Sequence, residues 1–277
     1  MKKANLKVHL KKISRNDFEI LEGLELNEIT NSMISHIGDT DPELRDELIY
    51  MTFYHWIIKK KYYSETDLHD ILHKIIDDEH LFYQIGNSDD DTVFTRAFSV
   101  LVVALLLNRH MEEKFIPEDE SPLVKEAVIN YFEKENDFRG YVKNKGWADA
   151  VSHGADALDE LVKTPFVEKE DLKRILNLIQ NQVMIKNYVY INEEPERMVT
   201  PVVKIINKEV ITTDEILDWI KEFNDFQKPE EYYIYHRLLL NIKGFLRGLY
   251  FRILEDEDKK QIREQIVMTL NELSEFN

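Results

Sequence analysis

The sequence predicts an all-α protein in which antiparallel helix pairs stack as a HEAT-like α-solenoid, also described as an α-α superhelix. Apolar residues recur at intervals of three and four along most of the chain. Helix-start signals are numerous, and neither sustained alternation nor an Asn-Gly hairpin signal occurs. Only seven prolines and eight glycines interrupt the 277 residues. We therefore expect about a dozen helices and few or no strands.

Proline and capping residues mark where these helices begin. Proline stands at an expected first helical position in Asp41-Pro42, Ser121-Pro122 and Lys228-Pro229. Capping boxes, or close relatives of one, start at Ser64, Thr212 and Asn16. Together with the apolar spacing, these signals predict helices at residues 4–13, 17–36, 42–61, 65–83, 90–111, 121–135, 147–163, 168–187, 195–208, 213–226, 230–254 and 258–275.

The third predicted helix shows why a stacked architecture is favoured. One apolar stripe of this helix runs through Leu48, and a second runs through Phe53. A helix with two apolar stripes lies between neighbours, which suits a solenoid of helix pairs better than a four-helix bundle. No fixed-period repeat is visible in the sequence. We predict a single all-helical domain over residues 1–277, with a possible soft boundary near 164–168.

Composition excludes several classes of function. The chain contains no cysteine, which rules out disulfides, thiolate zinc sites, iron–sulfur clusters and cysteine nucleophiles. Its formal charge of −17 repels phosphate backbones and anionic lipid, so we expect no nucleic acid and no membrane as partners. The apolar stretch at 97–107 is too short to cross a hydrocarbon layer of roughly 30 Å and predicts a buried core helix. The start of the chain lacks the apolar run of a signal peptide, and we expect a cytoplasmic protein.

The segment His69-Asp70-Ile71-Leu72-His73 has the spacing of a zincin metal motif, with aspartate where zincins have glutamate. His69 and His73 share a helix face and can bind one metal ion. Aspartate is one methylene too short to serve comfortably as the general base, and the spacing reveals no third ligand. A solvated helix face is the favoured interpretation. We predict no metal and no cofactor, with His69 and His73 as the residues that would hold a metal.

A polar stripe on the helix predicted at 147–163 is a second candidate site. Asp149, His153, Asp156 and Glu160 fall on one face at 100° per residue. Carboxylates beside an imidazole can bind a divalent metal or keep the histidine protonated for acid–base or anion-binding work. A glycine-flanked basic loop precedes the helix and can receive an anion or form a tight turn. The alternative is an ordinary solvent-exposed polar face.

Arginines are candidates for the opposite wall of such a groove. Arg96 is followed by apolar residues on the same helix face, so we expect its stem to be buried and its guanidinium to be paired in a structural ion pair. Near the end of the chain, Gly244 and Gly248 have a spacing that predicts close helix contact. The candidate groove arginines are Arg45, Arg96, Arg139, Arg197 and Arg247.

Four strings in the chain resemble a bacterial family described as domain of unknown function 2785: HIGDTDPELRDELIY (36–50), DDTVFTRAFSVLVVALLL (90–107), RGYVKNKGWADAVSHGADALDELV (139–162) and FLRGLYFRIL (245–254). The resemblance covers most of the chain and implies a helical fold without an assigned activity. It implies a histidine at the position of Asp149, so a metal site built on two histidines four residues apart would lose one ligand here. The family pattern includes Asp41, Arg45, Asp46, Phe94, Arg96, Arg139, Trp147, His153, Asp156 and Arg247.

The favoured functional hypothesis is a helical-repeat scaffold that binds a protein or peptide partner in a concave groove. The chain has no glycine-rich phosphate loop, no G-x-S-x-G elbow and no dinucleotide fingerprint. An enzyme or a binder of a small anionic ligand or metal around His153 is the alternative. A base-excision enzyme on a HEAT-like fold is a third possibility, which the charge of −17 disfavours.

Overall fold

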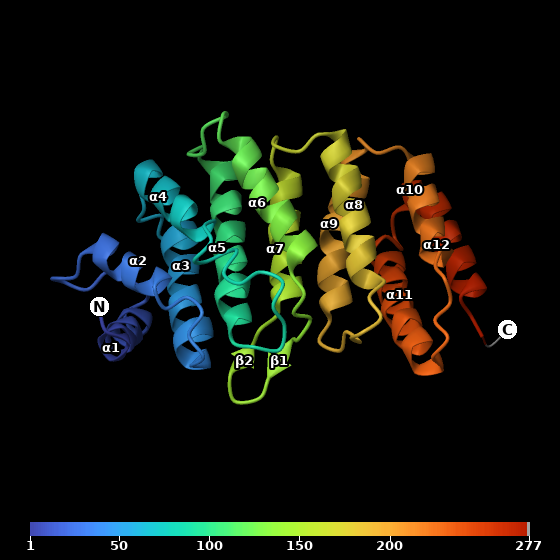
Figure 1. Ribbon diagram of the computed structural model, residues 1–277. Helices are drawn as coiled ribbons and strands as arrows, with labels where there is room; N and C mark the ends of the chain where they lie inside the picture. The colour runs from blue at the N-terminus through green and yellow to red at the C-terminus, as the bar shows by residue number, and fades with distance from the viewer. Residues whose placement is uncertain (276–277) are drawn as a thin grey trace. The chain divides into compact units, whose positions relative to one another are not determined.

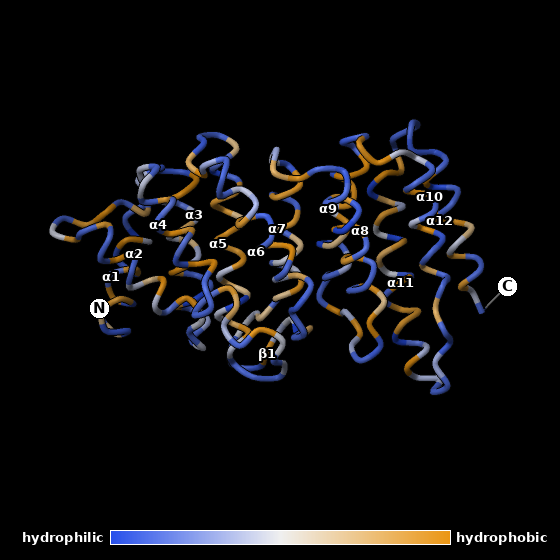
Figure 2. The backbone as a smooth tube through the Cα atoms, turned by 45° about the horizontal axis from the view of Figure 1, so that its top comes forward, coloured by the Kyte–Doolittle hydropathy of each residue, from blue (hydrophilic) through white to orange (hydrophobic). Residues whose placement is uncertain are grey.

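The computed structural model describes residues 1–275, which fold into twelve α-helices and one two-stranded sheet. The predicted all-α class is confirmed. The chain divides into two units, Met1–Thr164 (unit 1) and the residues from Pro165 onward (unit 2). In Figure 2 most helices alternate between hydrophilic and hydrophobic colours within each turn, as amphipathic helices do.

Unit 1 contains helices α1 to α7 and the short hairpin (Figure 1). Residues 43–59 form one helical segment whose ends are π-helical, with hydrogen bonds such as that from the Lys60 N–H to the His55 carbonyl, 2.7 Å. The elements are α1 (Lys3–Arg15), α2 (Leu26–Ile34), η1 (Glu43–Tyr50), α3 (Met51–Tyr54), η2 (His55–Lys59), α4 (Glu65–Ile75), α5 (Thr92–Glu112), α6 (Ser121–Lys134), β1 (Tyr141–Val142), β2 (Gly146–Trp147) and α7 (Ala150–Lys163).

Helix α5 is the core of unit 1. It packs against α4, α6, α7 and the helical segment 43–59. By length and composition α5 is apolar enough to cross a bilayer, but 83% of its most apolar window is buried inside the protein. The stretch 97–107 is buried throughout, which confirms the predicted core helix. Because most of α5 is buried, polar side chains in its buried part must pair with neighbouring elements.

Local capping fixes the starts of α4 and α10 where the sequence predicts them. Ser64 accepts a hydrogen bond from the Asp67 N–H, and Asp67 accepts one in return from the Ser64 N–H, so the predicted capping box is present. The box at Thr212 and Glu215 is also confirmed. The box expected at Asn16 is wrong, because Asn16 is the C-cap residue of α1.

Four further predictions required correction. The helix expected at 65–83 ends at Ile75, because the chain continues in turns over residues 76–86. The helix expected from 17 begins only at Leu26, because the chain turns through positive φ angles after α1. The helix expected from 147 begins at Ala150, since residues 146–147 pair with 141–142 in an antiparallel hairpin. Pro229 does not open a helix, as α11 begins at Tyr232.

Unit 2 contains helices α8 to α12. Helix α9 packs against α8 and α11, and α12 packs against α10 and α11. The predicted close contact at Gly248 is confirmed, because a Cβ there would lie 2.6 Å from a Glu196 carboxylate oxygen on α9. The elements are α8 (Lys169–Val183), α9 (Glu194–Lys208), α10 (Thr213–Lys221), η3 (Glu222–Asn224), α11 (Tyr232–Arg252), η4 (Glu257–Lys259) and α12 (Lys260–Glu272).

Candidate functional site

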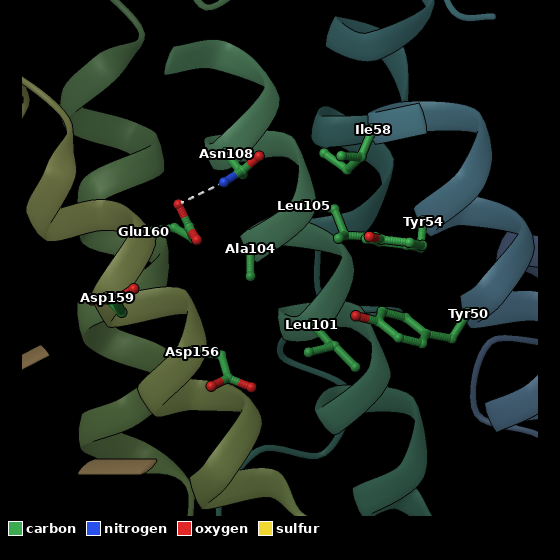
Figure 3. Close-up of a pocket in the computed structure, with 10 residues that line it drawn as sticks. All are labelled: Tyr50, Tyr54, Ile58, Leu101, Ala104, Leu105, Asn108, Asp156, Asp159 and Glu160. Atoms are coloured by element: carbon green, nitrogen blue, oxygen red, sulfur yellow. Dashed lines mark hydrogen bonds between the residues drawn. The ribbon is translucent and has the colours of Figure 1, made fainter. Parts of the chain in front are cut away.

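A cavity of about 360 Å³ opens between three helical segments of unit 1. Figure 3 shows side chains of α7 on one side, side chains of the segment 43–59 on the other, and α5 between them. The lining residues from α5 supply a mostly apolar floor with one amide. The complete lining consists of Tyr50, Tyr54, Ile58, Leu101, Ala104, Leu105, Asn108, Asp156, Asp159 and Glu160.

The wall contributed by α7 is acidic. Asp156, Asp159 and Glu160 line the cavity, and none of the described residues that line it carries a positive charge. Lys163, one turn further along α7, lies 2.6 Å from Asp159 Oδ2 and 2.9 Å from Glu160 Oε1. Partial burial opposes the charge of Lys163, but the hydrogen bonds that it donates to Asp159 and Glu160 outweigh this effect and raise its pKa. Three carboxylates against one ammonium leave this wall with a formal charge of −2.

Asp159 has unused hydrogen-bonding capacity. Only 9% of the residue is exposed. Its Oδ2 atom is paired with Lys163, whereas its Oδ1 atom is buried and has no hydrogen-bond partner among residues 1–275. A buried carboxylate oxygen without a partner costs roughly 1–3 kcal/mol or more, so a donor that reaches it from the cavity would be stabilised.

The opposite wall is aromatic. Tyr50, Tyr54 and Ile58 are spaced four residues apart along the π-helical segment, and the two tyrosine hydroxyls point toward the α5 side of the cavity in Figure 3. The ring of Tyr50 also meets Phe98 edge to face, with centroids 6.5 Å apart. Tyrosine faces attract cations, so both walls of the cavity favour a positively charged group.

The polar stripe predicted on α7 is divided along the helix. Asp156 and Glu160, at the C-terminal end, line the cavity, and Asn108 Nδ2 donates to Glu160 Oε2 at 3.2 Å. His153 lies nearer the start of α7, where its Nδ1 donates to the Ala97 carbonyl of α5 at 3.1 Å. Asp149 sits just before the helix with φ of 50°. The stripe faces α5 for much of its length, and its C-terminal part faces an opening.

Arg45 is fully buried at a junction between the segment 43–59 and the hairpin. Its guanidinium donates to the carbonyls of Asp39 and Lys145, both at 2.7 Å. It lies over the Phe94 ring at 4.2 Å, and its Nε is 2.7 Å from Asp46 Oδ1. Burial raises the pKa of Asp46 to about 6, although Arg45 opposes the shift. The guanidinium therefore holds the hairpin in place and does not face the cavity.

Arg96 and Arg139 are likewise engaged away from the cavity. Arg96 is fully buried and binds both carboxylate oxygens of Glu135, at 2.7 and 3.0 Å, which confirms the expected structural ion pair. Arg139 binds Asp137 through Nε at 2.9 Å and donates to the Asp90 carbonyl at 2.6 Å. Hydrogen bonding to Asp137 raises the pKa of Arg139. These arginines fix the loop before α5 and do not form an anion-binding wall.

His69 and His73 lie one turn apart on α4, as the zincin-like spacing predicts. The structure adds a third residue, because both Nε2 atoms reach Glu120 Oε2, His69 at 3.0 Å and His73 at 2.6 Å. The hydrogen bond from His73 is the largest cause that lowers the pKa of Glu120, and the one from His69 acts in the same direction. Sequence spacing could not reveal Glu120, which lies 47 residues beyond His73.

The sequence model of a family described as "Protein of unknown function (DUF2785)" matches residues 81–251, more than half of the chain. The chain belongs to the DUF2785 family. No curated protein and no solved structure matches it.

The cavity combines residues inside and outside the DUF2785 match. The floor on α5 and the acidic wall on α7 lie within residues 81–251, whereas the tyrosine wall precedes them. Sequence analysis identified Asp156 and the stripe containing Glu160, but missed Asp159 and the two tyrosines. The spacing of four residues between Tyr50 and Tyr54 predicts that they share one face of a helix. The local sequence does not indicate that this face lies opposite α7.

The remaining candidate arginines, Arg197 on α9 and Arg247 on α11, belong to unit 2 and are exposed. Arg247 lines a separate, smaller cavity together with Lys243 and Glu275. Neither arginine lines the acidic cavity of unit 1. The predicted groove residues are therefore distributed over several surroundings, and among them only Asp156 reaches this cavity.

Proposed function

We propose that this protein is a cytoplasmic helical-repeat scaffold whose unit 1 binds a basic side chain, lysine or arginine, of a protein or peptide partner. We further propose that its helices stack as HEAT-like pairs, which would present the cavity on an extended binding surface. The packing of α6 on α7 and of α8 on α9 within their units supports this arrangement.

The observation that carries the proposal is the acidic wall of the cavity, where Asp159 is a lining residue whose Oδ1 atom is buried and has no hydrogen-bond donor among the described residues. A lysine ammonium or an arginine guanidinium supplies such a donor together with the opposite charge. Charge-assisted hydrogen bonds of this kind are roughly twice as strong as neutral ones. The same group would be near Asp156 and Glu160, which share the wall.

The shape of the cavity suits a long basic side chain. Its volume of about 360 Å³ is at the small end of the range for ligand pockets, which favours a side chain over a larger molecule. Leu101, Ala104 and Leu105 form an apolar floor for a methylene chain, while the carboxylates receive the charged end. The tyrosine rings can add a cation–π contact of about 0.5–1 kcal/mol.

The net charge of −17 adds a long-range contribution to the same preference. It attracts basic segments and raises their rate of association, and salt screens this attraction over a Debye length of about 8 Å at physiological ionic strength. By contrast, no observation favours the alternative of an anionic ligand around His153, because Arg45, Arg96 and Arg139 are all engaged elsewhere.

Isothermal titration with three small probes tests the proposal: acetyl-lysine amide, acetyl-arginine amide and the neutral acetyl-norleucine amide. A basic probe should bind with a Kd on the order of 1 mM, about −4.1 kcal/mol, and the neutral probe at least about tenfold more weakly. Equal binding of charged and neutral probes, or no binding of either basic probe at several times this concentration, would refute recognition of a basic side chain.

Variants locate the binding. Asp159→Asn keeps the side-chain shape and removes the charge, so it should weaken the basic probes about tenfold or more. Ala104→Leu should block binding by filling the floor. Asp78→Asn is the matched control, since Asp78 is exposed and does not line the cavity. Equal affinity for the wild type, the Asp159 variant and the Ala104 variant would place any binding elsewhere.

A further inference from the structure

Three potential metal ligands converge where α4 approaches the start of α6. The Nε2 atoms of His69 and His73 lie 3.2 Å apart, and both contact the same Glu120 oxygen. All three ligand atoms lie within 4.8 Å of one another. Among the described residues, this is the group of histidine and carboxylate side chains whose geometry suits a metal ion.

The fold holds these side chains from two directions. The Ser64 capping box fixes the start of α4, and the buried residues Leu68 and Leu72 anchor the helix against the core. Glu120 is the N-cap residue of α6, and its backbone N–H donates to the Pro117 carbonyl at 3.1 Å. One face of α4 and the start of α6 therefore aim three ligands at one point, which a solvated helix face would not require.

The ligand set specifies the class of metal. Zinc binds imidazole nitrogen and carboxylate oxygen at about 2.0–2.2 Å, so tetrahedral ligands lie about 3.3 Å apart. The observed separations of 2.6 to 3.2 Å need to open by about 0.1 to 0.7 Å to reach this spacing. Two imidazoles with one carboxylate also suit other first-row divalent ions, whereas the absence of cysteine disfavours soft ions such as Cu(I).

We propose that His69, His73 and Glu120 form a binding site for one divalent first-row transition-metal ion, with Zn²⁺ as the best match. Three protein ligands leave a fourth position for water or for an external ligand. The side chains are 29%, 39% and 30% exposed, so this position faces solvent. The ion would connect α4 to the start of α6, and the site shares no residue with the acidic cavity.

The experiment uses the full chain after treatment with EDTA and dialysis. Zn²⁺ binding is measured by competition with a chromogenic chelator, and Co²⁺ is added separately to detect the visible absorption of a tetrahedral site. The variants are His73→Gln and Glu120→Gln. His80→Gln is the matched control, because His80 also pairs with a carboxylate, Asp77 at 2.8 Å, but has no second histidine in its cluster.

The wild type and the His80 variant should bind one equivalent of Zn²⁺ and give the tetrahedral Co²⁺ spectrum. The His73 and Glu120 variants should bind at least about tenfold more weakly, since loss of even an outer partner of a metal ligand costs 10- to 100-fold. Circular dichroism checks folding, and His69→Gln replaces any variant that does not fold. Affinity that is the same in the wild type and the ligand variants, or that falls equally in the His80 variant, would overturn the site.

Discussion

Replacing Arg96 by methionine should destabilise unit 1 more than any other single ion-pair deletion on α5. The arginine and its partner Glu135 are both buried, with side chains 0% and 1% exposed. Arg96 also donates to the Tyr83 and Asn87 carbonyls, at 3.0 and 2.9 Å, so it anchors the loop before α5. Methionine fills similar space but removes the guanidinium that binds the buried Glu135 carboxylate.

The expected loss of stability follows from removing one partner of this buried ion pair. Removing one partner of a buried ion pair typically costs about 3–5 kcal/mol. Glu135 would retain the N–H groups of Asn136 and Asp137, at 3.0 and 2.9 Å, which favours the lower half of that range. The matched control is Arg109→Met on the same helix. Arg109 is 5% exposed, but its partners Glu112 and Glu113 are each 49% exposed. When Arg109 is removed, water can solvate both carboxylates, so these ion pairs should contribute only about 0–1 kcal/mol to stability.

Native-state hydrogen exchange read by mass spectrometry is the appropriate assay, because it reports α5 and α6 separately from unit 2. The Arg96 variant should lower the free energy of opening of both helices by about 3 kcal/mol. The double variant Arg96→Met with Glu135→Gln should lose less free energy of opening than the two single variants lose in sum, and the difference should be about 1 kcal/mol or more. Additive losses, or an Arg96 loss no larger than that of Arg109→Met, would refute the assignment of the pair as the main polar support of this core.

Two further predictions concern the same unit. Gly38→Ala should cost about 1–3 kcal/mol or more in urea unfolding, because a Cβ there would lie 2.6 Å from the Thr95 backbone on α5. Gly244→Ala, inside helix α11 and with no neighbour closer than 3.9 Å, should instead stabilise by about 0.5–1 kcal/mol, since alanine is the better helix former. Equal losses in the two variants would contradict the packing argument. A second prediction concerns His110, which is buried and whose Nδ1 accepts hydrogen bonds from the Phe115 and Ile116 N–H groups at 3.1 and 3.2 Å. Burial first, and the positive charge of Lys114 second, lower the pKa of His110 from 6.5. The contribution of His110 to the free energy of unfolding should be complete above pH 6.5 and should decline as the pH falls toward the lowered pKa. Asp46, whose pKa is raised to about 6, changes the free energy of unfolding with pH in the opposite direction. Urea midpoints at pH 7.5 and 5.5 should therefore shift less in His110→Gln than in the wild type, and equal shifts would exclude His110 as the cause.

Helix positions could be predicted because their causes are local. The capping residue Ser64 and its partner Asp67 are three residues apart, and both lie in the sequence window that sets the helix start. The hairpin was missed for the opposite reason, since each strand contributes only two residues and shows no alternation. The π-helical ends of the segment 43–59 were also missed, because the apolar spacing of three and four does not distinguish hydrogen bonds to the fourth and fifth residue.

Contacts between distant segments could not be predicted from the same patterns. Arg45 binds the Lys145 carbonyl 100 residues away, and His73 meets Glu120 47 residues away. In both cases the sequence identifies a residue with unsatisfied chemistry but not the partner that satisfies it. For Arg45 the partners are backbone carbonyls, which have no signature in the sequence at all.

The polar stripe of α7 shows how packing changes the chemistry available to a correctly predicted helix face. Near the start of α7, the Ala97 carbonyl on α5 accepts the hydrogen bond of His153. Further along, the small side chain of Ala104 leaves room, and Asp159 retains a carboxylate oxygen without a donor among the described residues. Helical periodicity places His153 and Asp156 near one face and Asp159 about 120° from His153, but the side chains of the facing helix decide which of them remain available to a ligand. Binding of a basic group at Asp159 therefore depends on α5 as much as on α7, which is why Ala104→Leu and Asp159→Asn should have the same effect.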